Sequence, residues 1–153
     1  RIHEVSARNA RQFSSTELGA VFAAYDAQAL SNIGKQDDAV AAMTIAVHTM
    51  QDATLRDRYT VTLSLMQLDS AQKSTQSAGE ATLQKISRQQ DHSANDVALF
   101  FLGDYLWSQK KFAQAKSYFQ TLVIRYGTSD MRHPSPYAQV ARARLGLISL
   151  EGL

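Results

Sequence analysis

The chain has 153 residues, enough for one domain with a hydrophobic core, and its 16 Lys and Arg exceed its 14 Asp and Glu by only two charges. So small an excess is weak evidence for nucleic-acid binding, and the absence of Cys excludes disulfides, thiolate catalysis and thiol-ligated zinc. Pro and Gly are sparse, Ala and Gln are abundant, and Val and Ile are few, which favours helices over strands. No apolar run is long enough to cross a bilayer.

A first helix hairpin is predicted near the start of the chain. Residues 14–17 (SSTE) have the form of a capping box, which satisfies free backbone N–H groups where a helix begins. Apolar residues then recur at steps of three and four up to Gly34, a residue suited to the left-handed conformation that ends a helix. Asp37 and Asp38 begin a second helix, where negative charge is favourable against the helix dipole. The apolar positions are Leu18, Phe22, Tyr25 and Ala29, then Val40, Met43, Ala46 and Val47.

Two more hairpins and a closing helix follow. The second hairpin is the weaker prediction, because its helices are joined by the polar stretch SAQKSTQSAGE. The third begins with the capping-box-like residues 93–96 (SAND), turns at Lys110 and Lys111, and continues as a helix to about Tyr126. A Pro-rich break, HPSP, precedes a last helix over about 137–151. The apolar positions of the second hairpin are Leu63, Leu65, Met66 and Leu68, then Ala78, Ala81, Leu83 and Ile86.

The third hairpin resembles a tetratricopeptide repeat, whose pattern is W-x2-L-G-x2-Y…A-x3-F…P. With Asp96 as the first position, Leu102-Gly103 falls on the Leu-Gly pair, and Ala115 and Phe119 have the A-x3-F spacing. The small residues Gly103 and Ala115 would let the two helices approach closely. Leu99 stands at the Trp site, Leu106 at the Tyr site, Phe112 at the start of the second helix, and Lys110 where Gly is common.

Weaker copies of the pattern extend the resemblance over most of the chain. The predicted units are 20–53, 59–92, 96–129 and a half unit over 137–151. Since one hairpin cannot bury its whole apolar face, such units stack. The resemblance therefore implies an all-α fold: a right-handed α-solenoid of about three antiparallel hairpins plus a lone C-terminal helix, forming a single domain over residues 1–153. The matching residues are Ala27, Ala39 and Met43 in the first unit, Leu65, Met66 and Ala78 in the second, and Leu145-Gly146 in the half unit.

The layout is more loosely similar to the tetratricopeptide-like periplasmic domains of membrane-tethered bacterial envelope proteins. The residues that carry this likeness are the lone closing helix and a basic start with Arg1, His3, Arg8 and Arg11. It implies a scaffold or chaperone-like role beside translocation or outer-membrane assembly machinery, on the periplasmic side of the inner membrane. The alternative location is the cytoplasm. The chain would reach a membrane only through an anchor outside this sequence.

In this family the concave face is lined by the second, fifth, ninth and twelfth positions of the first helix of a unit. In the best unit these positions hold Val97, Phe100, Asp104 and Trp107. Two aromatic rings beside a carboxylate suit a peptide that carries a basic residue. The alternative is that Phe100 and Trp107 pack against the preceding unit, since aromatic stripes at helical spacing usually belong to a core. By weaker alignment the same wall holds Gln28, Gln67 and Ala143.

Motifs for catalysis, metal ions and cofactors are missing from the sequence. The four His have no ligand spacing, no Ser lies in a G-x-S-x-G turn, and the Gly residues do not form a phosphate loop. We therefore predict a non-enzymatic protein without cofactor, metal, nucleic acid or small-molecule substrate. The pair Arg142 and Arg144 is predicted to lie on the solvated surface, and the alternative for Arg142 is an ion pair with Glu151 or the chain end.

The last helix is apolar nearly all round, and no second helix follows to cover it. Solenoids usually end on a polar cap, so this helix either inserts against the preceding hairpin or binds a partner through its outer face. The predicted function is a protein–protein interaction module that binds protein or peptide segments. The alternative is a structural subunit that assembles end to end, or as a homodimer, through this helix. The binding candidates on it are Leu147 and Leu150, beside Val140, Leu145 and Ile148.

Overall fold

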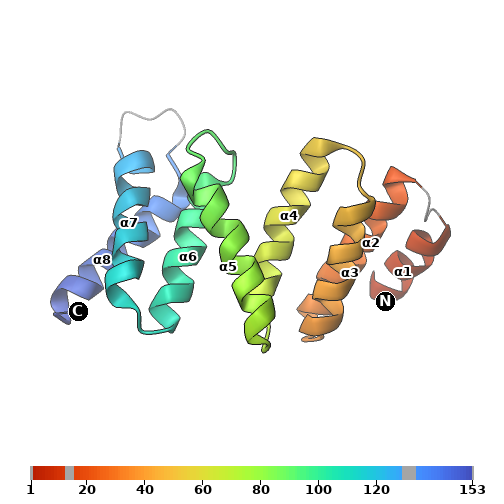
Figure 1. The fold of residues 1–153 in the computed structure, drawn as a ribbon, viewed down its shortest axis with the longest axis horizontal. Helices are drawn as coiled ribbons and strands as arrows, with labels where there is room; N and C mark the ends of the chain where they lie inside the picture. Colours follow the sequence, from red (N-terminus) through yellow and green to blue (C-terminus); the bar gives the residue numbers. More distant parts are fainter. Residues whose placement is uncertain (1, 13–15, 129–133, 153) are drawn as a thin grey trace. The chain divides into compact units, whose positions relative to one another are not determined.

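The structure is a computed structural model that describes residues 2–12, 16–128 and 134–152. Over these residues the chain forms eight α-helices and no strands (Figure 1), which confirms the all-α prediction. The helices are α1 (Ile2–Gln12), α2 (Glu17–Asn32), α3 (Gln36–Thr49), α4 (Ala53–Leu68), α5 (Lys73–Arg88), α6 (Asn95–Ser108), α7 (Phe112–Tyr126) and α8 (Pro136–Leu150).

The helices belong to two compact units, residues 1–80 and 81–153, and the boundary between them falls inside α5. Each unit has its own buried apolar cluster. In unit 1 the cluster joins α2, α3 and α4 around Met43 and Ala27. In unit 2 it joins α6, α7 and α8 around Phe119 and Ile148. The solenoid arrangement and the single domain over 1–153 stay predictions.

The hairpins α2–α3 and α6–α7 are closed by the same turn. Gly34 has a φ of 82° and Lys110 a φ of 59°, both in the left-handed region. The next residues, Lys35 and Lys111, have φ and ψ of −87° and 64° and of −88° and 61°. In each turn this residue donates its N–H to the preceding helix: Lys35 to the Leu30 carbonyl at 3.0 Å, and Lys111 to the Leu106 carbonyl at 2.9 Å. Lys110 therefore adopts the conformation that Gly34 provides without a steric cost.

The second helices of the two hairpins bury residues at the same spacing. Phe119 packs against Gly103, where a built β-carbon would lie 2.5 Å from the ring. The predicted packing positions are confirmed: Ala39, Met43 and Ala46 in α3, and Ala115, Phe119 and Leu122 in α7, are all 0% exposed.

In α5 the prediction is wrong by one residue. Ala78 is exposed, and Gly79 is the buried small residue. A β-carbon on Gly79 would stand 2.6 Å from the Ser64 carbonyl oxygen of α4, so the close approach of the helices requires glycine there. Leu83 and Ile86 follow Gly79 at the spacing seen in α3 and α7, and both are buried.

The helix starts differ in detail from the predicted capping boxes. Thr16 caps α2 by accepting from Gly19 N at 3.1 Å, while the Glu17 carboxylate accepts from the backbone of Gln51 and Asp52. Ser14, Ser15 and His133 lie outside the described residues. The cap position of α6 is Ala94, which makes no side-chain bond. The Pro-rich break precedes α8 as predicted: Ser135 caps the helix and Pro136 is its first residue.

Candidate protein-binding surfaces

The residues of α6 that were predicted to line the concave face lie on the side of α6 that faces α8, within unit 2. Phe100 stacks on Tyr137 of α8, with ring centroids 5.0 Å apart and planes 29° apart. Trp107 meets Phe112 edge-on at 5.5 Å, and both Phe100 and Trp107 contact the ring of Phe119. The rings are half-buried and form part of the core cluster of unit 2.

These contacts place Phe100 and Trp107 at the core of unit 2, where they pack against residues of α7 and α8. Val97 begins the stripe one turn earlier and is also half-buried. Asp104, between the rings, keeps 42% of its side chain exposed. A role of Val97, Phe100, Asp104 and Trp107 in protein binding stays a prediction.

Arg144 of α8 provides the basic group that the stripe was predicted to attract. Its Nη2 donates to Asp104 Oδ1 at 3.1 Å, and its guanidinium carbon lies 5.6 Å from the centroid of the Trp107 ring. Its Nε is buried and has no hydrogen-bond partner in the described part of the chain. Arg144 was predicted to be solvated; it is half-buried, with 36% of its side chain exposed.

Arg142 points to a different neighbour. Its Nη2 donates to the carbonyl oxygen of Gly127, at the end of α7. Arg142 is exposed, as predicted, and the alternative of an ion pair with Glu151 is not observed among the described residues. Glu151 lies exposed after the last turn of α8. Arg142 therefore contacts the preceding hairpin from α8, as Tyr137 and Arg144 also do.

The outer face of α8 remains uncovered in the described structure. The helix buries Ala138, Ala141 and Ile148, so it does pack against the preceding hairpin. On the other side Leu147 is 43% exposed and Leu150 is 86% exposed. Both residues were named from the sequence as binding candidates on this outer face, and their role in binding stays a prediction.

A cavity of about 640 Å³ lies between α1 and α2 in unit 1. Helix α1 was not predicted; it packs along α2 and is held by a hydrogen bond between His3 Nδ1 and Asp26 Oδ1. Of the predicted groove residues, Gln28 lines this cavity. The lining residues are Ile2, Tyr25, Ala29 and Ile33, which are largely apolar, and His3, Glu4, Ser6, Gln28 and Asn32, which are polar.

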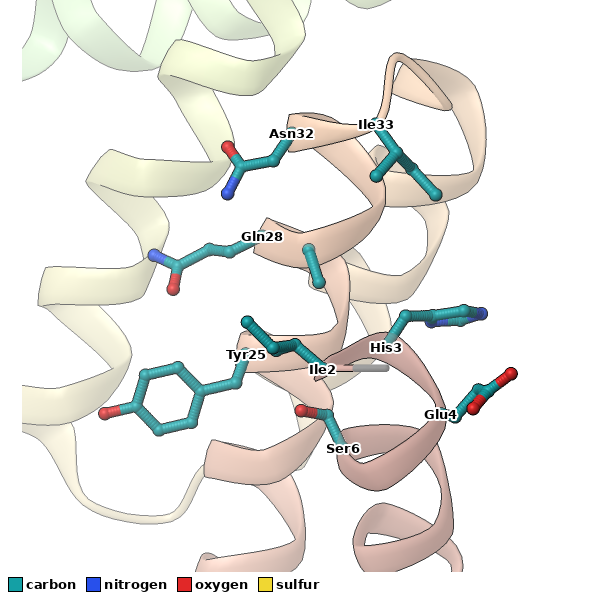
Figure 2. Close-up of a pocket in the computed structure, with 9 residues that line it drawn as sticks. Ile2, His3, Glu4, Ser6, Tyr25, Gln28, Asn32 and Ile33 are labelled. Atoms are coloured by element: carbon teal, nitrogen blue, oxygen red, sulfur yellow. The ribbon is translucent and has the colours of Figure 1, made fainter.

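Three side chains of α2 contribute polar atoms to the lining of the cavity. Figure 2 shows Tyr25, Gln28 and Asn32 pointing to the same side of α2. Neither the Gln28 nor the Asn32 carboxamide has a hydrogen-bond partner among the described residues. At the rim, Ile2 is 74% and Ile33 is 61% exposed. A carboxamide can both donate to and accept from a peptide backbone, while the apolar rim can cover a side chain.

The other residues predicted for the groove wall do not share this cavity. Gln67 of α4 is half-buried, and its β-carbon faces Gly79 of α5. Ala143 is exposed on α8, beside Leu147. Of the residues placed on the wall by weaker alignment, the cavity therefore includes only Gln28.

Two tyrosines have shifted acidities. Burial raises the pKa of Tyr59, and the neighbouring Tyr25 raises it further. Burial also raises the pKa of Tyr126, and the negative charge of Asp96 adds to this effect.

The described residues include no group of acidic or His side chains that could hold a metal ion. None of the described helices combines the length and apolar character needed to span a membrane.

Comparison with known proteins gives no relative. No protein-family model, no curated protein and no solved structure matches the chain.

Proposed function

We propose that the chain is a non-enzymatic protein-interaction module of the tetratricopeptide-like kind, and that it binds a peptide segment of a partner in the α1–α2 cavity. The repeated turn at Gly34 and Lys110 supports the helical-repeat part of this proposal. So does the equal spacing of the buried residues in α3 and α7. Stacking of such hairpins into a solenoid is part of the proposal.

One observation carries the peptide-binding part: Gln28 and Asn32, whose carboxamides have no partner among the described residues, line the same cavity as the exposed side chains of Ile2 and Ile33. Exposed apolar groups next to unpaired polar groups are typical of a surface that is completed by a ligand. An extended peptide would hydrogen-bond to the carboxamides through its backbone. One bulky apolar side chain of the peptide would cover the isoleucines.

The experiment is a titration followed by NMR, with the side-chain NH₂ signals of Gln28 and Asn32 as direct reporters. The probe is a pool of capped octapeptides, each with one Leu, Ile or Phe in a Gly-Ser background. Both signals should shift, and Gln28→Ala/Asn32→Ala should weaken binding about tenfold, because each hydrogen bond contributes about 0.5–1.5 kcal/mol. The matched control is Gln120→Ala, an exposed carboxamide on α7. Absence of shifts at millimolar peptide would refute the proposal.

The cellular setting is also a proposal. The similarity to tethered envelope domains supports a scaffold role beside translocation or outer-membrane assembly machinery, on the periplasmic side of the inner membrane. Fractionation of the native source would test this location against the cytoplasm, which is the alternative. Recovery of the chain from the cytoplasmic fraction alone would refute the envelope proposal.

The alternative function is a structural subunit that assembles through α8, without a peptide ligand. A separate observation favours it: Leu147 and Leu150 are large apolar side chains that remain exposed on a helix whose buried residues are Ala138, Ala141 and Ile148. Substitutions in the α1–α2 cavity would leave this function intact. Substitutions at Leu147 or Leu150 would abolish it.

A further inference from the structure

The exposed apolar residues of α8 form one narrow stripe. They are Val140, Ala143, Leu147 and Leu150, which follow each other at steps of three, four and three residues. This spacing keeps them on one side of a helix, as in the seam of a coiled coil. Gly146 borders the stripe, and a β-carbon built on it would meet no atom within 4 Å.

The stripe has the same spacing when it is read from either end. If a second α8 runs antiparallel to the first, with a twofold axis level with Leu145, each stripe residue meets a stripe residue of the other copy. Val140 then lies opposite Leu150, and Ala143 lies opposite Leu147. A small side chain faces a large one in the central layers, so the two helices can pack closely.

The charges beside the stripe favour the same arrangement. Arg144 and Glu151 border it seven residues apart, and Arg144 lies on the side that faces α6. In antiparallel packing the residues on this border face each other, so Arg144 of one copy meets Glu151 of the second copy, twice per pair. In parallel packing they would instead face Gln139 and Gly146, and no opposite charges would meet. Glu151 forms no ion pair within the described chain.

We infer that the outer face of α8 binds a second copy of this chain in antiparallel orientation, forming a closed twofold dimer. The inference rests on the alternative function above, assembly through α8. It differs from end-to-end assembly in the size of the product. A twofold contact uses the same surface on both copies and leaves none free, so assembly stops at two chains instead of continuing end to end. Because one helix face is smaller than the roughly 800 Å² per partner of a standard interface, we expect a dissociation constant on the order of 10–100 μM.

The absence of Cys from the chain allows a direct test of the geometry by disulfide trapping. We expect Val140→Cys and Leu150→Cys to cross-link with each other when the two variants are mixed at about 100 μM and oxidised. Each variant alone should cross-link poorly, because its two copies of the thiol would lie about 15 Å apart along the helix axis. Ile124→Cys on α7, which is 75% exposed, is the matched control and should not cross-link. Efficient cross-linking of Leu150→Cys with itself would overturn the antiparallel geometry.

Sedimentation velocity measures the association itself. The unmodified chain should show a monomer–dimer equilibrium with no larger species, Leu147→Asp should abolish it, and Glu151→Lys should weaken it several-fold. A monomer at every concentration up to 1 mM would overturn both the dimer and the self-assembling function. A continuing series of larger species would overturn only the closed dimer. If the chain stays monomeric and the octapeptide pool shifts the signals of Val140 and Leu147, the face binds a foreign segment and the inference fails.

Discussion

Phe119 of α7 lies directly against the backbone of Gly103 in α6, so close that a β-carbon on Gly103 would stand 2.5 Å from Cε1 of the ring. Phe119 is fully buried and cannot move away without disturbing the core of unit 2. The Leu145-Gly146 pair of α8 is different. Gly146 faces open space in the described structure, since a β-carbon built on it would meet no atom within 4 Å.

We therefore expect opposite effects of the same substitution at the two glycines. Gly103→Ala should lower the free energy of unfolding by about 1–3 kcal/mol, the usual cost of overpacking a core. Gly146→Ala should raise it by up to about 1 kcal/mol, because alanine favours the helix and meets no obstacle. Urea unfolding of unit 2, followed by the fluorescence of Trp107, measures both. Equal effects would contradict the close contact.

Lys110 offers a stabilising substitution. Its φ of 59° is unfavourable for a residue with a β-carbon, whereas Gly34 occupies the same turn position in the first hairpin without strain. Lys110→Gly should raise the free energy of unfolding by about 0.5–1 kcal/mol. The control is Lys111→Gly, at a φ of −88°, where glycine relieves nothing. If both variants lose stability, the left-handed turn is not a source of strain.

Asn95 is the most heavily bonded buried polar side chain described in unit 2. Its Nδ2 group lies 2.9–3.0 Å from the carbonyl oxygens of Ile86, Ser87 and Gln89, where α5 ends. Its Oδ1 accepts from Arg125 Nη1 at 3.1 Å and from the Tyr126 hydroxyl at 2.8 Å.

Asn95→Ala should therefore lower the free energy of unfolding by about 2–4 kcal/mol, since it leaves several buried groups without partners. Ser93→Ala is the matched control. Ser93 would be the capping residue if residues 93–96 formed a capping box, but the described structure gives it no such role. We expect it to change stability by less than about 0.5 kcal/mol in the same urea experiment. A larger loss for Ser93→Ala than for Asn95→Ala would favour the sequence-based interpretation.

Tyr126 should make the stability of unit 2 depend on alkaline pH. Its pKa is raised above the ordinary value of 10.0 by burial and by Asp96, so the folded state holds the phenol proton more tightly than the unfolded state. This contribution is fully present below about pH 10 and is lost as pH rises through the folded pKa. The urea midpoint by circular dichroism should fall above pH 10, and less steeply in Tyr126→Phe. If the midpoint falls equally steeply with pH in Tyr126→Phe, Tyr126 is not the cause of the pH dependence.

The hairpins could be predicted because their signals lie close together in the sequence. Gly34, the acidic start of α3 and the three- and four-residue steps all act within one or two helical turns. The polar turn before α5 offers no such marker, so a shift of one residue placed Ala78 where Gly79 packs.

The contacts of α8 could not be predicted in the same way. The partner of Asp104 is Arg144, forty residues later in the chain, and no local spacing relates the two. The sequence did indicate that the stripe of α6 attracts a basic group, but it could not show that the group belongs to the same chain. Gln28 was placed on a surface by alignment. Helix α1, which completes the cavity around it, consists mostly of polar residues and was not anticipated.

The short turns at Gly34 and Lys110 also bear on how quickly each hairpin can form. Helices joined so closely make mostly contacts between residues near in sequence, and such contacts form fast, commonly in microseconds to milliseconds. The stacking of Tyr137 on Phe100 and the pairing of Arg144 with Asp104 need a much longer segment to close. We expect these contacts to form after the folding barrier, so Tyr137→Ala should speed unfolding in stopped-flow experiments and leave the refolding rate of unit 2 nearly unchanged.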